Sequence, residues 1–219
     1  MIVELKQWSK LAKVPESNAL VETYTGNSLR KVVHPSYQAW SYAQLISDYN
    51  AAVQDDEIQL APCAFLHNYI RQDNDPIDDR QYDLYTSAAP AFTKGQVYEL
   101  RSFIRSMVRK GDNSEVLYRI DHGKIRPSKS LQDSIVSMVK GNEEFTMIDE
   151  QRVVFEEILR ISEQCQRDHK KRTVICQGGP GTGKSVVAVR LLAALTARGQ
   201  FVQYASKNQA PRLVYLEKL

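Results

Sequence analysis

The sequence predicts an α/β protein in two parts: a mixed sheet with helices in residues 1–110, and the first strand–helix–strand unit of a second domain in residues 147–219. Short apolar runs of strand length alternate with longer stretches in which apolar residues recur every three or four positions. A polar stretch containing several glycines, residues 111–146, separates the two parts and is predicted to be a linker. The 219 residues are 42% hydrophobic and 25% charged, a composition typical of globular chains.

The first part is predicted to start with a strand over residues 1–8 and to continue through a turn-rich connection over 15–34. A helix begins at Pro35, because proline is favoured in the first helical turn, and Trp40 and Ala43 start its apolar stripe. His67 is predicted to be a hydrogen-bonded core histidine. The remaining elements are a buried strand over 58–69, a solvated acidic loop over 71–83 and a helix over 97–110.

The second part shows a clearer alternation of elements. Apolar residues at helical spacing predict helices over 149–166 and 184–198, the second one ended by Gly199. Strands are predicted on either side of the second helix, over 172–177 and 201–205. Two further helices are predicted, a short one near 130–139 and one that begins at Pro211.

A glycine-rich loop connects the predicted strand 172–177 to the following helix. Its residues match the pattern G-x-x-x-x-G-K-[ST] in full: Gly178, Gly179, Pro180, Gly181, Thr182, Gly183, Lys184 and Ser185. Glycines let backbone N–H groups approach phosphate oxygens, and the start of the helix adds a favourable dipole. Lys184 is predicted to reach the β- and γ-phosphates of ATP, and Ser185 to bind Mg²⁺. The alternative is a glycine-rich turn without a ligand.

Composition excludes several classes of protein. A net charge of +3 excludes a strongly basic tail that binds polyanions. No apolar run is long enough to cross a membrane. The three cysteines Cys63, Cys165 and Cys176 fit no zinc-binding spacing. We expect reduced thiols, and therefore a cytoplasmic protein.

Two segments, one before and one after the glycine loop in the sequence, resemble helicase motifs. Residues 148–151, Ile-Asp-Glu-Gln, resemble the glutamine motif of superfamily 1 helicases, in which the glutamine amide, here that of Gln151, reads the adenine edge. An ordinary helix start capped by Asp149 is the alternative. Residues 204–211 are similar to helicase motif Ia, whose polar residues and backbone amides hold nucleic-acid phosphates. A plain polar connection explains them equally well.

The first predicted strand carries Glu4 and Lys6, which alternation places on one face. A carboxylate there can hold Mg²⁺ while the lysine polarises water. The pair resembles the second half of the PD-(D/E)xK nuclease motif, although the solvated face of an edge strand is the alternative. Gln38 and Tyr42, four residues apart on the next helix, resemble the Q-x-x-x-Y of RecB-like nucleases. The aspartate that this motif carries on a preceding strand is missing, so we expect half a metal site, with Glu4 as its ligand.

The whole chain resembles a bacterial family in which a nuclease-like domain is fused to a helicase domain similar to that of group 3 Schlafen proteins. The segments that carry the resemblance are 2–8, 34–42, 64–69, 89–96, 125–133, 148–151, 178–185 and 206–212. It implies a PD-(D/E)xK nuclease-like domain over 1–110 and the front of a RecA-like P-loop domain over 147–219. It also implies ATP-dependent action on nucleic acid, with DNA favoured over RNA.

Enzyme activity of the chain itself stays open at this stage. After Ser185 the only acid is Glu217, so we expect the Walker B acid to lie beyond Leu219 and the chain to be truncated at both ends. The leading interpretation is the ATP-binding front of a nuclease-helicase. The alternative is a non-catalytic module with a degenerate nuclease fold that binds nucleic acid or a partner. A small P-loop kinase is disfavoured, because too little chain follows the loop for an acceptor site.

Overall fold

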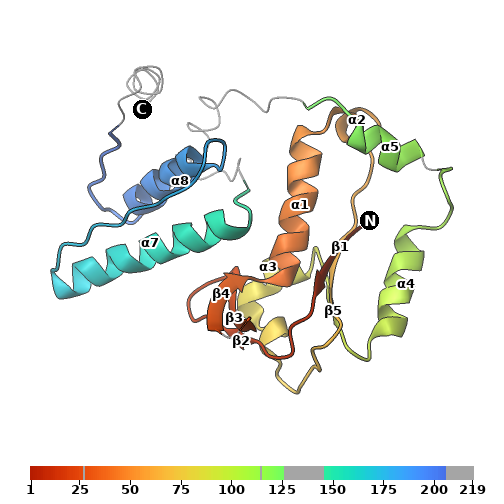
Figure 1. The fold of residues 1–219 in the computed structure, drawn as a ribbon, viewed down its shortest axis with the longest axis horizontal. Coiled ribbons are helices and arrows are strands. Elements are labelled where there is room, and N and C mark those ends of the chain that lie inside the picture. The colour runs from red at the N-terminus through yellow and green to blue at the C-terminus, as the bar shows by residue number, and fades with distance from the viewer. Residues whose placement is uncertain (27, 114, 126–145, 206–219) are drawn as a thin grey trace. The chain divides into compact units, whose positions relative to one another are not determined.

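The computed structural model describes residues 1–26, 28–113, 115–125 and 146–205, and it shows a mixed α/β protein (Figure 1). The chain divides into two compact units, Met1–Arg126 (unit 1) and Pro127–Leu219 (unit 2). The helix predicted near 130–139, the residues 206–211 of the proposed motif Ia and the helix expected from Pro211 lie outside the described residues. In the part of the chain that is described, no helix has the length and hydropathy needed to span a membrane.

A parallel sheet lies at the centre of unit 1. Its strands are β1 (Ile2–Lys6), β5 (Pro62–Leu66) and β6 (Ala91–Thr93), in the order β1-β5-β6. The strands predicted over 1–8 and 58–69 are therefore confirmed, whereas β6 follows no sequence signal that we recognised. Ala64 and Leu66 on β5 are fully buried, so the middle strand supplies the centre of this core.

Helix α1 (Pro35–Tyr49) provides the crossover that two parallel strands require, and it packs against both β1 and β5. The predicted start at Pro35 is confirmed. The residue before it, His34, caps the helix, because its Nδ1 accepts a hydrogen bond from the backbone N–H of Ser36 at 3.1 Å. A short helix, α2 (Ala51–Asp55), follows α1.

A second, antiparallel sheet occupies the region predicted to be a turn-rich connection over 15–34, and that prediction is wrong. The sheet consists of β2 (Ala12–Lys13), β3 (Leu20–Thr25) and β4 (Ser28–Val33). Cross-strand pairing buries Leu20 against Val33, which stabilises the base of the β3–β4 hairpin. The predicted single mixed sheet is thus two separate sheets, one parallel and one antiparallel.

The acidic segment 71–83 is folded rather than a solvated loop. It contains the short helices η1 (Pro76–Asp78) and η2 (Arg80–Tyr82) and leads into α3 (Asp83–Thr86). Asp75 is buried and accepts hydrogen bonds from the Tyr69 hydroxyl at 2.7 Å and from the backbone N–H of Ile77 at 2.9 Å. These bonds satisfy the carboxylate and therefore allow an acidic segment to enter the core.

Three further features of unit 1 bear on the sequence predictions. His67 is exposed, so the prediction of a core histidine is wrong. The helix predicted over 97–110 is confirmed as α4 (Val97–Met107). Within the predicted linker lies α5 (Glu115–Asp121), which is tied to the end of α1 because the side chain of Asn50 donates to the carbonyl of Ile120 at 2.7 Å.

Unit 2 is built on two helices, α7 (Asp149–Asp168) and α8 (Lys184–Ala197), which confirm the two predicted helices. They pack through a small apolar core that contains Met147, Phe155, Leu159 and Val187. The strands predicted over 172–177 and 201–205 are not formed. Both segments run without strand partners in the described part of unit 2, and isolated strands have no stable place for their backbone hydrogen bonds.

Candidate functional site

The glycine loop Gly178–Gly183 leads directly into α8, which begins at Lys184. Gly181 and Gly183 have φ angles of +75° and +80°, a left-handed conformation that favours glycine. Residues 178–182 are exposed, so their backbone is open to solvent. A turn of this shape before the positive end of a helix can bind an anion, because the first backbone N–H groups of the helix have no partner within it.

The ammonium group of Lys184 folds back over this loop. Its Nζ donates hydrogen bonds to the carbonyl oxygens of Gly178, at 2.7 Å, and of Gly179, and it lies 3.4 Å from the hydroxyl of Thr182. That hydroxyl donates in turn to the carbonyl of Gly179 at 2.9 Å. A phosphate group bound in the loop would compete with neutral carbonyls for the same cation, and a charged acceptor forms the stronger bond.

Gln151 connects the start of α7 to the glycine loop. Its Oε1 accepts from the backbone N–H of Ile148 at 3.3 Å, and its Nε2 donates to the carbonyl of Thr182 at 3.1 Å. A Cβ atom placed on Gly183 would lie 2.3 Å from this Nε2. The left-handed backbone therefore favours glycine at position 183, and an added Cβ would force the Gln151 amide to move. Sequence analysis assigned this amide to adenine, and the structure shows it in contact with the loop.

Ser185, the predicted Mg²⁺ ligand of the loop, is exposed in the first turn of α8, next to Lys184. A hydroxyl in this position suits a cation held between the loop and a nucleotide phosphate, because Mg²⁺ binds few protein ligands and takes the rest from phosphate and water. Across the described residues, no group of three or more His, Cys, Asp or Glu side chains is placed to hold a metal ion.

The predicted nuclease pair forms an ion pair in unit 1. The Nζ of Lys6 lies 2.9 Å from Oε1 of Glu4, and both side chains are 17% exposed. The same ammonium lies 5.0 Å from the centre of the Trp8 ring. Sequence analysis did not assign Trp8 a role. The available signal was that Trp8 lies two residues after Lys6, because alternate residues of an extended chain share a face.

The face of the sheet that carries Glu4 and Lys6 is the one covered by α1. On β1, Val3 and Leu5 point to the opposite face and are exposed, Leu5 by 64%, whereas Glu4 and Lys6 are half-buried. Because α1 packs on β1 and β5, it must cover the less exposed face. The opposite face is partly covered by α4, where the rings of Phe92 and Phe103 are in contact.

Gln38 and Tyr42 lie on α1 and contact each other, since Nε2 of Gln38 donates to the Tyr42 hydroxyl at 2.8 Å. The Oε1 of Gln38 is buried and has no hydrogen-bond partner among the described residues. The two predicted pairs, Glu4–Lys6 and Gln38–Tyr42, are therefore on the same side of the parallel sheet. The glycine-loop residues and Gln151 form a separate group in unit 2.

Comparison with known proteins gives one result for unit 2. Residues 171–219 match the family model described as Schlafen group 3, DNA/RNA helicase domain. The match includes the whole glycine loop and α8, and it supports a Schlafen-like helicase domain in this part of the chain. No curated protein and no solved structure matches the chain.

Proposed function

We propose that this chain is the ATP-binding front part of a nuclease-helicase that acts on nucleic acid, with DNA favoured over RNA. The observation that supports it best is the glycine loop, in which left-handed Gly183 leads into α8 and Lys184 folds over the loop carbonyls. The match of residues 171–219 to a helicase domain supports the class of reaction. In the intact protein, ATP hydrolysis would drive remodelling of DNA or RNA.

The loop and its neighbours have distinct roles in nucleotide binding in this proposal. Lys184 neutralises the β- and γ-phosphates, and the N–H groups of the loop and of α8 bind their oxygens. Ser185 supplies a hydroxyl ligand to Mg²⁺, which offsets the remaining phosphate charge. Gln151 is close enough to the loop to sense a bound nucleotide, either by reading adenine or by holding Thr182.

A second candidate function applies to unit 1. The Lys6 ammonium is bonded directly to the Glu4 carboxylate, so the two groups neutralise each other. Glu4 also has too few carboxylate neighbours among the described residues to form a metal cluster. These observations favour a site that does not cleave nucleic acid, and the second candidate is therefore a degenerate nuclease fold that binds nucleic acid or a partner.

Calorimetric titration of the chain with Mg-ATP tests the main proposal. We expect binding in the wild type and none in Lys184→Ala, because the phosphate charge is then not neutralised in the loop. Lys170→Ala is the matched control, since Lys170 is an exposed lysine outside the loop. Equal binding by wild type and Lys184→Ala would refute the assignment of the loop to ATP.

A further inference from the structure

We propose that the outer half of the β3–β4 hairpin binds single-stranded nucleic acid. We call this surface the hairpin tip and define it as residues 24–25 and 28–31. The inference rests on the proposed function only for the class of partner. The position of the surface comes from the structure of unit 1, whereas the glycine loop belongs to unit 2.

The pairing of the two strands sets which side chains lie together. Tyr24 pairs with Leu29, Thr23 with Arg30, and Glu22 with Lys31. Residues paired across an antiparallel ladder share a face, and alternate residues along a strand share it too. Glu22, Tyr24, Leu29 and Lys31 therefore lie on one face of the hairpin, and Arg30 lies on the other.

The base and the tip of the hairpin differ sharply in burial. At the base, Val21 is fully buried and Val33 is 5% exposed. At the tip, Tyr24 is 57% exposed and Leu29 is 54% exposed. The core thus anchors the hairpin at its base, while an aromatic ring and an aliphatic side chain stand side by side in solvent. This apolar pair does not contribute to the core and is available to a ligand.

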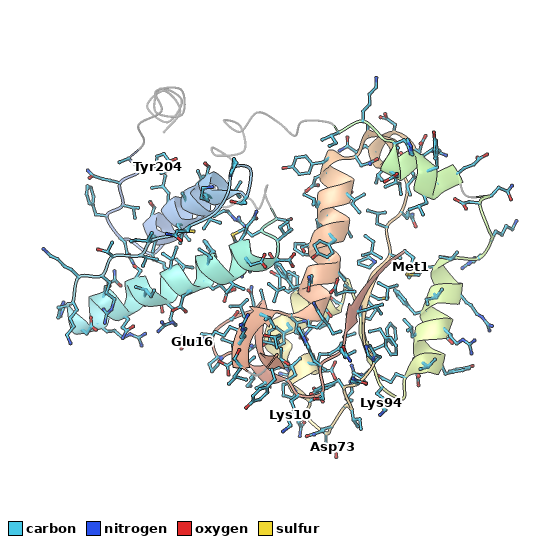
Figure 2. The ribbon with its side chains drawn as sticks, in the orientation of Figure 1. Met1, Lys10, Glu16, Asp73, Lys94 and Tyr204 are labelled. Atoms are coloured by element: carbon cyan, nitrogen blue, oxygen red, sulfur yellow. The ribbon has the colours of Figure 1, made fainter. Side chains whose placement is uncertain are left out.

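Positive charge lies on both faces of the hairpin tip. Lys31 is on the face of Tyr24, where it pairs with Glu22, the only acid in the two strands, and Arg30 is exposed on the other face. Lys10 lies beside the hairpin, because its carbonyl accepts a hydrogen bond from the hydroxyl of Thr23 at 2.6 Å (Figure 2). The other nearby lysine, Lys13, forms an ion pair with Asp79 at 2.6 Å.

This combination fits single-stranded nucleic acid better than an acidic or apolar protein surface. Lysine and arginine neutralise phosphates, and a base can stack on a tyrosine ring whatever its sequence. In addition, β4 lies at the edge of its sheet among the described residues, and no described strand pairs with its outer side. Backbone N–H groups of this kind bind phosphate oxygens.

Fluorescence anisotropy with a labelled oligothymidylate tests the proposal on the full chain. We expect Tyr24→Ala to weaken binding about fivefold or more, the loss that follows removal of one stacked base. Tyr24→Phe should bind like the wild type, because it keeps the ring. Tyr98→Ala, which removes an exposed tyrosine from α4, is the matched control and should leave binding unchanged.

The salt dependence of binding tests the phosphate contacts. Removing Arg30 and Lys31 together by alanine substitution should reduce the slope of log affinity against log salt by about 1.4, or about 0.7 for each contact. Substituting Arg101 and Arg105 on α4 removes the same charge elsewhere in unit 1 and should leave the slope nearer to that of the wild type.

The outcomes separate this inference from the proposed function. A chain that binds Mg-ATP but whose oligonucleotide affinity is the same in Tyr24→Ala and in the Arg30/Lys31 variant would overturn the hairpin inference alone. Absence of oligonucleotide binding by the wild type would also overturn it. An equal loss in the α4 control variants would show a general charge or folding effect and would equally contradict a binding surface at the hairpin tip. An oligoribonucleotide of the same length, run in parallel, distinguishes RNA from DNA.

Discussion

The Nε2 atom of His34 lies 3.1 Å from the backbone carbonyl oxygen of Ile77, which joins the start of α1 to the acidic segment 71–83. The other ring nitrogen accepts a hydrogen bond from Ser36, so the proton is on Nε2 and is donated to Ile77. The imidazole is fully buried and stacks on Tyr82 with 4.5 Å between ring centres. Burial lowers the pKa of His34 to about 4.

The first prediction is that His34 makes unit 1 less stable in acid. Between pH 6.5 and about 4 the unfolded chain takes up a proton at His34 that the folded chain does not, so the free energy of unfolding falls as the pH falls. The shift corresponds to about 3 kcal/mol in total. Urea unfolding followed by tryptophan fluorescence at several pH values measures it.

The control for this prediction is the substitution of a second, exposed histidine. His34→Gln should lower stability at neutral pH and flatten its dependence on pH. His67→Gln changes an exposed histidine and should do neither. An unchanged pH dependence in His34→Gln would show that other groups cause the acid sensitivity.

The second prediction concerns Gly183. Gly183→Ala should weaken binding of Mg-ATP about tenfold, because the left-handed φ angle costs alanine about 1–2 kcal/mol and the new Cβ would force the Gln151 amide to move. Gly199→Ala is the matched control. It has a φ angle of +72° and nothing within 4 Å of the added Cβ, so it carries the strain without the clash. Calorimetric titration of both variants decides, and unchanged affinity in Gly183→Ala would contradict the prediction.

The third prediction concerns Gln151. Gln151→Ala removes hydrogen bonds to Ile148 and Thr182 and should destabilise the start of α7 by about 1 kcal/mol. The backbone amide of Ile148 should then exchange its hydrogen faster, which mass spectrometry can follow. Gln166→Ala, on an exposed position of the same helix, should leave that exchange unchanged. Unchanged exchange in Gln151→Ala would show that the bond contributes nothing to the helix start.

The fourth prediction concerns Glu4 and Lys6. We expect no nicking of plasmid DNA in the presence of Mn²⁺, because Glu4 is neutralised by Lys6 and the described residues contain no cluster of metal ligands around it. Gel electrophoresis of the plasmid measures this. Nicking that disappears in Lys6→Ala and persists in Lys94→Ala, an exposed lysine elsewhere, would establish a working nuclease site instead.

Local patterns were enough to predict several elements. The apolar spacing predicted α1, α4, α7 and α8, because a helix satisfies its own backbone and needs only one apolar face. The motif G-x-x-x-x-G-K-[ST] predicted the loop before α8, because its glycines and lysine follow one another in sequence. These predictions depend on neighbours within a few residues and so can be made from the chain alone.

Other features depend on contacts between distant segments. The hairpin β3–β4 was predicted to be a turn-rich connection, because Pro15, Gly26 and Asn27 are turn residues and no local pattern shows the pairing that buries Leu20 and Val33 at its base. The segment 71–83 was predicted to be solvated, because no local pattern shows that Asp75 would find Tyr69 as a donor. The strands predicted over 172–177 and 201–205 are not formed. Their apolar pattern is typical of strands, but a local pattern does not show whether a second strand is there to pair with.

The sequence by itself determined the four long helices α1, α4, α7 and α8 and the position of the glycine loop, and it predicts which residues would hold phosphate and Mg²⁺. Only the tertiary structure decided that Gln151 contacts Thr182, that Lys6 is bonded to Glu4 and lies over Trp8, and that Tyr24 and Leu29 form an exposed pair. The physical reason is the range of the interactions. Helix periodicity and turn chemistry act over a few residues, whereas strand pairing, burial and side-chain contacts depend on which distant segments fold against each other.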